Sequence, residues 1–286
     1  MSFGATYTVG EVLRRSAAYL AEREVETPRL DAELLLGKAL GLSRLQLYLE
    51  HDRSLVRSEL EACRDAVRRR GRREPAAYIL GEWGFRRLTL RVDSRALVPR
   101  PETEVVVERC LELVGPIERP RVLDVGTGSG AIALSIADEH REATVTALDA
   151  SREALELAGD NARRTGLEAR VRFVQGDFRR GLPVGPYDLV VSNPPYVAEA
   201  ELAAAQPEVR DWEPRRALVG GLGDVRAIAS ASAGVLAPGG ALVLEAAERR
   251  AAETADALRE LFFRDVAVSS DLAGRPRVVE GRAPQV

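Results

Sequence analysis

The chain has 286 residues, which is enough for one large and one small domain with a substantial hydrophobic core. With 45% hydrophobic and 30% charged residues it has the composition of a soluble globular protein, and it contains no apolar run of membrane-spanning length. Its net charge of -3 argues against a protein that mainly grips a phosphate backbone, so we expect no stable nucleic-acid binding.

The first residues and the cysteines indicate the compartment. Met1 to Ala5 lack the basic and then apolar profile of a signal peptide. Cys63 and Cys110 lie in separate predicted helices and match no metal-binding spacing. We therefore expect a cytoplasmic protein without a membrane partner, a disulfide or a metal site.

Residues 1–73 are predicted to form a small all-helical domain, because apolar residues recur at helical spacing and no alternating run appears. Thr27 and Pro28 supply an N-cap and a first-turn proline for a helix that Gly41 is expected to end. The strongest basic cluster, residues 68–73, is interpreted as a solvated helix end, and contact with an acidic or RNA-bearing partner stays open. We expect this helical domain to dock a large substrate. Its helices are expected near 9–20, 28–41, 43–49 and 54–70.

Residues 74–97 are predicted to be a connecting segment that contains a hairpin between 78 and 92, because Gly81 and Gly84 punctuate it and 87–92 has strand character. Residues 98–286 then form the second domain. It opens with a helix from Pro101 to about Val114, since proline and acidic residues suit a first helical turn.

From Pro120 onward strands and helices alternate, which predicts an α/β domain with a parallel sheet covered by helices on both faces. Strands are expected near 121–125, 143–149, 170–175, 187–192, 240–245, 265–269 and 276–281. Helices are expected near 129–138, 151–165, 225–236 and 248–261.

A glycine-rich turn follows the first of these strands. Its residues Gly126, Thr127, Gly128, Ser129 and Gly130 let the backbone approach a ligand closely at a helix N-terminus. The glycine spacing fits both a nicotinamide cofactor and S-adenosylmethionine. The carboxylates near this turn favour the second cofactor.

Three carboxylates and one aromatic ring favour S-adenosylmethionine over a nicotinamide cofactor. Asp124 is placed to meet a cationic amino group, such as that of a methionyl moiety, and would gain nothing beside a pyrophosphate. Asp149 ends the next strand and can accept both ribose hydroxyls. Asp177 and Phe178 follow the strand after it and suit an adenine, since one accepts from the exocyclic amine and the other covers the ring.

The run Asn193-Pro194-Pro195-Tyr196 follows the strand 187–192 and is rich in hydrogen-bond acceptors. The two prolines have no amide hydrogen, Asn193 offers a carboxamide oxygen, and Tyr196 offers an aromatic face. Such a loop suits a substrate that presents an NH2 on a flat group. A plain turn after a strand is the alternative, because Asn-Pro is a common turn opener.

These motifs, together with segments outside them, resemble the release factor glutamine methyltransferases, a family of class I S-adenosylmethionine-dependent methyltransferases with a Rossmann-like seven-stranded domain. The match runs nearly end to end. It is carried by Asp124 to Gly130, Asn193 to Tyr196, Thr27 to Leu36, Pro75 to Gly81, Leu97 to Glu104, Glu213-Pro214, Ala217-Leu218 and Asp271 to Arg275. Phe178 stands where tryptophan is familiar, and residues 220–224 are richer in glycine than expected.

The resemblance implies methyl transfer from S-adenosylmethionine to the N5 atom of a glutamine, in the Gly-Gly-Gln motif of class I peptide chain release factors. It implies that Gly126 to Gly130, Asp149, Phe178 and Asn193 contact the cofactor, and that Asn193 to Tyr196 hold the glutamine. If Asn193 and the carbonyl of Pro194 each accept one N–H, the amide nitrogen is fixed with its lone pair toward the methyl group.

Three alternatives stay open. An adenine N6-methyltransferase acting on DNA or RNA uses the same acceptor loop on a flipped base, but the acidic balance argues against it. A glutamine methyltransferase acting on a ribosomal protein is harder to exclude. A nicotinamide oxidoreductase leaves Asn193-Pro194-Pro195-Tyr196 unexplained.

Overall fold

The computed structural model describes residues 7–283, which form two compact units. One unit contains residues 7–81 and Gln206–Trp212, and the other contains Glu82–Ala205 and residues 213–283. Among these residues no helix combines the length and apolar character that crossing a membrane requires. The expectation drawn from Met1 to Ala5 falls outside the described residues.

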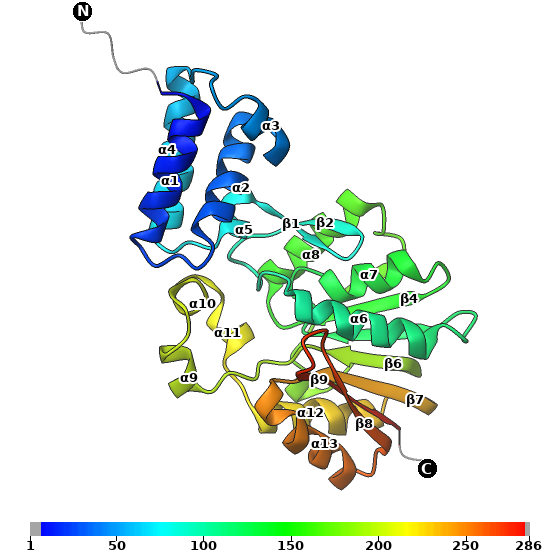
Figure 1. The fold of residues 1–286 in the computed structure, drawn as a ribbon. Helices are drawn as coiled ribbons and strands as arrows, with labels where there is room; N and C mark the ends of the chain where they lie inside the picture. The colour runs from blue at the N-terminus through cyan, green and yellow to red at the C-terminus, as the bar shows by residue number, and fades with distance from the viewer. Residues whose placement is uncertain (1–6, 284–286) are drawn as a thin grey trace, which may run out of the picture. The chain divides into compact units, whose positions relative to one another are not determined.

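The first unit is all-helical (Figure 1). Capping boxes at Thr8 and Ser43 begin two of its helices, and Gly41, in the left-handed region with φ of 65°, ends the helix that starts at Pro28. Its core includes Leu20, Leu36, Leu47 and Cys63. The helices are α1 (Val9–Ala21), α2 (Pro28–Leu40), α3 (Arg44–Leu49), α4 (Arg57–Gly71), α5 (Ala76–Leu80) and α10 (Pro207–Trp212).

The basic cluster 68–73 is not simply a solvated helix end. Arg70 is buried and pairs with Asp31 at 2.6 Å and with Glu208 of α10 at 2.8 Å. Arg73 also pairs with Glu208, at 2.7 Å. The interpretation as a solvated end was wrong for these two arginines, because carboxylates from distant segments neutralise them. Arg68 and Arg72 remain exposed.

The connecting hairpin is shorter than expected. Residues around Tyr78 belong to α5, which Gly81 ends with φ of 72°. The hairpin itself consists of β1 (Glu82–Phe85) and β2 (Leu88–Arg91), which pair antiparallel. It belongs to the second unit, whereas α5 belongs to the first.

A seven-stranded sheet organises the second unit, with strand order β5-β4-β3-β6-β7-β9-β8. The five strands from β5 to β7 run parallel, and β9 and β8 complete the sheet antiparallel. This confirms the predicted fold class. The strands are β3 (Arg121–Val125), β4 (Thr144–Asp149), β5 (Val171–Gln175), β6 (Tyr187–Ser192), β7 (Leu236–Glu245), β8 (Arg264–Ser270) and β9 (Pro276–Arg282).

Helices cover both faces of this sheet (Figure 1). Alternate strand residues point to opposite faces, so Leu189 and Val191 pack with α6 and α7 while Val190 packs with α12 and α13. The long helices are α6 (Pro101–Val114), α7 (Ala131–Glu139), α8 (Arg152–Thr165), α12 (Leu222–Ala233) and α13 (Ala251–Glu260). The short ones are α9 (Glu199–Ala203), α11 (Arg215–Leu218), η1 (Phe178–Arg180) and η2 (Glu248–Arg250).

Candidate active site

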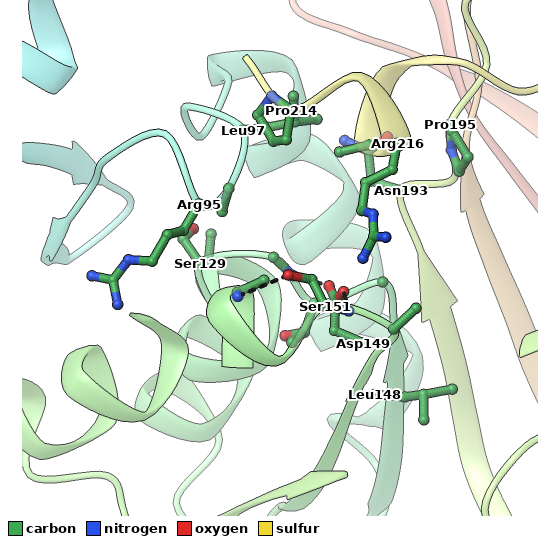
Figure 2. Close-up of a pocket in the computed structure, with 18 of the residues that line it drawn as sticks. Arg95, Leu97, Ser129, Leu148, Asp149, Ser151, Asn193, Pro195, Pro214 and Arg216 are labelled. Carbon is green, nitrogen blue, oxygen red and sulfur yellow. Dashed lines mark hydrogen bonds between the residues drawn. The ribbon is translucent and has the colours of Figure 1, made fainter. Parts of the chain in front are cut away.

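A cavity of about 700 Å³ lies where the parallel strands β3 to β6 end (Figure 2). Ligands of open α/β sheets bind at this edge, because the loops after adjacent parallel strands meet there. The predicted residues that line the cavity are Gly126, Thr127, Gly128, Ser129, Asp149, Asp177, Phe178, Asn193 and Pro195. The predicted residues that are not part of its lining are Asp124, Gly130, Pro194 and Tyr196.

The glycine-rich turn is fixed to the neighbouring strand by its own backbone. The amides of Gly126 and Thr127 both donate to the carbonyl of Leu148, at 2.8 and 3.0 Å. Gly126 has φ of 77° and Gly128 has φ of 57°, which a side chain would strain. Among residues 7–283, a Cβ on Gly126 would meet nothing within 4 Å, and one on Gly128 would meet only Ala96, at 3.8 Å. The turn therefore presents bare backbone to the cavity.

Gly130 has a different task from the other two glycines. A Cβ there would come within 3.0 Å of Leu134 and 3.2 Å of Ala158. Because glycine has no Cβ, α7 and α8 can pack closely behind the turn. Its φ of 84° also suits only glycine well.

Asp124 lies beneath the turn rather than in the cavity wall. Its Oδ2 accepts from Thr127 Oγ1 at 2.6 Å and from the amide of Ala133 at 3.2 Å. Its Oδ1 is buried and has no hydrogen-bond partner among residues 7–283. Burial raises the pKa of this carboxyl to about 7. In this arrangement Asp124 braces the turn and the start of α7, and its direct contact with a ligand stays a prediction.

Asp149 faces the cavity with both oxygens already oriented. Oδ2 accepts from the amide of Gly128 at 2.9 Å, and Oδ1 accepts from the amide of Ser151 at 2.8 Å. Each carboxylate oxygen can still accept another hydrogen bond, so a pair of vicinal hydroxyls fits here. Arg216 of α11 extends toward this side of the cavity (Figure 2).

Asp177 and Phe178 form the wall beyond β5. Oδ1 of Asp177 accepts from the amide of Arg179 at 2.9 Å, which caps η1. The guanidinium of Arg179 lies 4.7 Å from the centre of the Phe178 ring. A planar ligand in the cavity would therefore meet the ring beside a fixed carboxylate.

Asn193 is held by a chain of hydrogen bonds that reaches across the site. Its Nδ2 donates to Thr103 Oγ1 at 3.4 Å, and Thr103 Oγ1 donates to Glu245 Oε2 at 2.7 Å. Tyr196 completes the chain because its hydroxyl donates to Glu245 Oε1 at 3.3 Å. No hydrogen bond to Oδ1 of Asn193 occurs within the described residues, so that oxygen remains an available acceptor.

Burial shifts the pKa values of the two titratable groups in this hydrogen-bond chain, the Glu245 carboxyl and the Tyr196 hydroxyl. It raises the pKa of Glu245, while hydrogen bonds from Thr103 and Tyr196 lower it. Burial and the nearby Glu245 together raise the pKa of the Tyr196 hydroxyl well above its usual value. Tyr196 therefore acts as a hydrogen-bond donor and packing surface rather than as a base.

Sequence reasoning missed several residues around the cavity. Thr103 and Arg100 lie in its lining, and Arg100 donates from Nη2 to both oxygens of the buried Glu213, at 2.6 and 2.7 Å. Glu245 comes from the end of β7. The only signal for Thr103, Arg100 and Glu213 was their presence in segments that resemble a family, which gave them no chemical role.

Two family descriptions match the chain. Residues 11–81 match the PrmC N-terminal domain, and residues 103–209 match the methyltransferase small domain. Among solved structures, an S-adenosylmethionine-dependent O-methyltransferase from Thermotoga maritima has a TM-score of 0.51 at 18% identity, covering 67% of this chain and 68% of that one. This likeness supports the fold alone.

Curated relatives match along nearly the whole length. A release factor glutamine methyltransferase from Chlorobaculum tepidum is 46% identical over 277 residues, covering 93% of this chain and 94% of the relative. One from Deinococcus radiodurans is 43% identical over 277 residues, covering 95% of this chain and 97% of the relative. The chain therefore belongs to the release factor glutamine methyltransferase family.

Proposed function

We propose that this protein transfers a methyl group from S-adenosylmethionine to the N5 atom of a glutamine in a protein, namely the Gly-Gly-Gln motif of a class I peptide chain release factor. The observation that carries the proposal is the orientation of Asn193. Its amide NH2 is engaged by Thr103, which leaves its oxygen as an acceptor at the cavity. Membership of the family supports the same reaction.

The residues present fit S-adenosylmethionine. Bare backbone at Gly126 and Gly128 lets a ligand approach closely, and Asp149 can accept the ribose hydroxyls. Asp177 and Phe178 suit the adenine, as a carboxylate beside a ring. When bound, S-adenosylmethionine supplies an electrophilic methyl group carried on a sulfonium.

The chain's own contribution is to position the glutamine amide. An amide nitrogen is a poor nucleophile because its lone pair is delocalised into the carbonyl. In the proposal, Oδ1 of Asn193 and the carbonyl of Pro194 each accept one N–H, which fixes the nitrogen and stabilises the positive charge that develops on it. No strong base is required, because the proton can leave after the nitrogen has become cationic. His51 and His140, the chain's two histidines, have no role in it.

The helical unit is proposed to dock the protein substrate, because its described residues include none of the lining of the cofactor cavity. We further propose that the reaction takes place in the cytoplasm and needs no stable binding to nucleic acid. The arginines of the cluster 68–73 that are ion-paired inside the helical unit are less available to a phosphate backbone.

The test is to incubate the protein with methyl-labelled S-adenosylmethionine and, in parallel, a release factor, ribosomal proteins and an adenine-containing duplex. Mass spectrometry of the digested products should find methylglutamine in the Gly-Gly-Gln motif of the release factor alone. Methylated adenine at a comparable rate, or methylglutamine only in a ribosomal protein, would replace the proposed substrate. Absence of label in all three would refute the proposal.

A further inference from the structure

A second hollow lies in the helical unit, between α1 and α4, and it is separate from the cofactor cavity. Its volume is about 320 Å³. Val12, Leu60 and Val67 contribute apolar side chains to it, and three exposed arginines, Arg15, Arg64 and Arg68, stand around them. We call this the α1–α4 groove.

None of the three arginines, Arg15 of α1 and Arg64 and Arg68 of α4, has a carboxylate partner among residues 7–283, unlike the other arginines of α4. Arg57, Arg69 and Arg70 of α4 all form ion pairs inside the unit. Within residues 7–283, no ion pair involves the arginines of the groove. Their positive charge is therefore available to an anionic partner, because the fold itself does not neutralise it.

An aromatic ring orders two of these guanidinium groups. Arg15 lies 4.7 Å and Arg64 lies 6.0 Å from the centre of the Tyr7 ring. A cation above an aromatic face is held by the ring's quadrupole, which reduces the entropy that the side chain loses on binding. The rim is thus partly organised for a ligand before the ligand arrives.

We infer that the α1–α4 groove binds an acidic segment of the protein substrate, with an apolar side chain on the groove floor and carboxylates on the arginines. This inference rests on the proposed function, because it assigns the segment to the protein that carries the methylated glutamine. The groove floor favours a polypeptide over RNA. A phosphate backbone would match the arginines but would leave the accessible apolar surface of the groove without an apolar partner; Leu60 offers more of that surface than Val12 and Val67, which are largely buried.

The test uses the full-length protein with two exposed arginines reversed in charge, Arg15→Glu/Arg64→Glu. The matched control is Arg14→Glu/Arg72→Glu, which makes the same charge change at exposed residues of α1 and of the α4 C-cap that do not line the groove. Steady-state methylation is measured with an intact release factor and with a short Gly-Gly-Gln peptide. Calorimetry of S-adenosylmethionine binding checks that the site is intact.

For the groove variant we expect KM for the release factor to rise about tenfold, because each exposed charge pair contributes modestly and reversal adds repulsion. Its kcat at saturation, its turnover of the peptide and its cofactor affinity should stay as in the wild type. The KM of the wild type should also rise with salt more steeply than that of the variant. The control should behave as the wild type.

Four results would overturn the inference. An unchanged KM for the release factor in the groove variant would show that the groove does not bind the substrate, while the proposed function would still stand. An equal loss of methylation activity toward the release factor and the peptide would show that the groove residues affect only the stability of the protein. Binding of a single-stranded RNA that the variant loses, with no change toward the release factor, would assign the groove to nucleic acid. A wild-type protein inactive on both substrates would refute the proposed function, and this inference with it.

Discussion

Thr103 is predicted to control the rate of methyl transfer by orienting Asn193. Its hydroxyl accepts from Asn193 Nδ2 at 3.4 Å and donates to Glu245 Oε2 at 2.7 Å. The substitution Thr103→Val keeps the shape of the side chain but removes both bonds. Asn193 then loses the contact that distinguishes its amide nitrogen from its oxygen, and Glu245 loses a buried donor.

The expected loss follows from the geometry. A bond of 3.4 Å is at the long limit for a hydrogen bond, so holding Asn193 contributes about 0.5–1.5 kcal/mol, or roughly a twofold to tenfold fall in rate. Removing the acceptor itself by Asn193→Ala should lower the rate of methyl transfer by roughly 10²–10³, which corresponds to about 3–4 kcal/mol, as for other preorganised polar groups. The two substitutions should not be additive, since both act through the same oxygen.

Single-turnover transfer at saturating substrate and cofactor measures this step without contributions from binding. Thr103→Ser keeps the hydroxyl and is the control, with a rate expected close to that of the wild type. Tyr196→Phe removes the other hydroxyl that donates to Glu245 and should have a smaller effect than Thr103→Val, because it does not touch Asn193. A wild-type rate for Thr103→Val, or full additivity with Asn193→Ala, would refute this reasoning.

Three further predictions concern the cofactor turn, pH and stability. Gly128→Val should weaken S-adenosylmethionine binding about 100-fold or more in calorimetry while the sheet stays folded, because a branched side chain would occupy the backbone face of the cavity; undiminished affinity would contradict the cofactor assignment. Because the pKa of Asp124 is raised to about 7 from its usual value of about 4, the folded state holds its proton more tightly than the unfolded chain, so stability falls as pH rises between these values. The melting temperature of Asp124→Asn should therefore decline less from pH 5 to pH 8 than that of the wild type, and an equal decline would show that Asp124 does not titrate there. Arg70→Met should lower the free energy of unfolding by about 3–5 kcal/mol in urea titrations, since it leaves Asp31 buried and unpaired, and the double variant Arg70→Met/Asp31→Leu should recover much of that loss.

The sheet could be predicted from the sequence because its central strands carry local signals. Parallel strands buried on both faces are continuous apolar runs, and β3 and β6 occupy the predicted residues 121–125 and 187–192. Both strands are followed by residues that interrupt a sheet, the glycines after Val125 and the prolines after Asn193. Local composition therefore gave both the strands and the edge at which their loops meet.

The orientation of Asp124 is a detail that spacing alone did not predict. Its distance from the first glycine placed it near the turn, but on a strand the direction of a side chain alternates. Asp124 shares a face of β3 with Val122, which packs in the cluster with α6 and α7, so its carboxylate lies under the turn. Counting the strand's period from Val122 would have suggested this orientation.

The contacts between distant segments had no signal in the sequence. Glu208 lies 135 residues from Arg73, and Glu245 lies 142 residues from Thr103. Periodicity and capping describe neighbours within a few turns, and they cannot say which carboxylate will neutralise a given arginine. For this reason the helical unit's ion-paired interior and the hydrogen-bond chain behind Asn193 both required the structure.

The register between β3 and β6 explains how cofactor and substrate groups come to share one cavity. Val125 pairs with Ser192, and the Ser192 hydroxyl donates to the Val125 carbonyl at 2.7 Å. The next residues along the two strands are Gly126 and Asn193, so this pairing sets the glycine turn beside the acceptor loop. A slip of one residue would turn every side chain of β6 to the opposite face, so Leu189 and Val191 would lose their packing against α6 and α7 and Val190 would lose its packing against α12 and α13. The hydrophobic cores on the two faces of the sheet therefore fix the alignment on which the proposed methyl transfer depends.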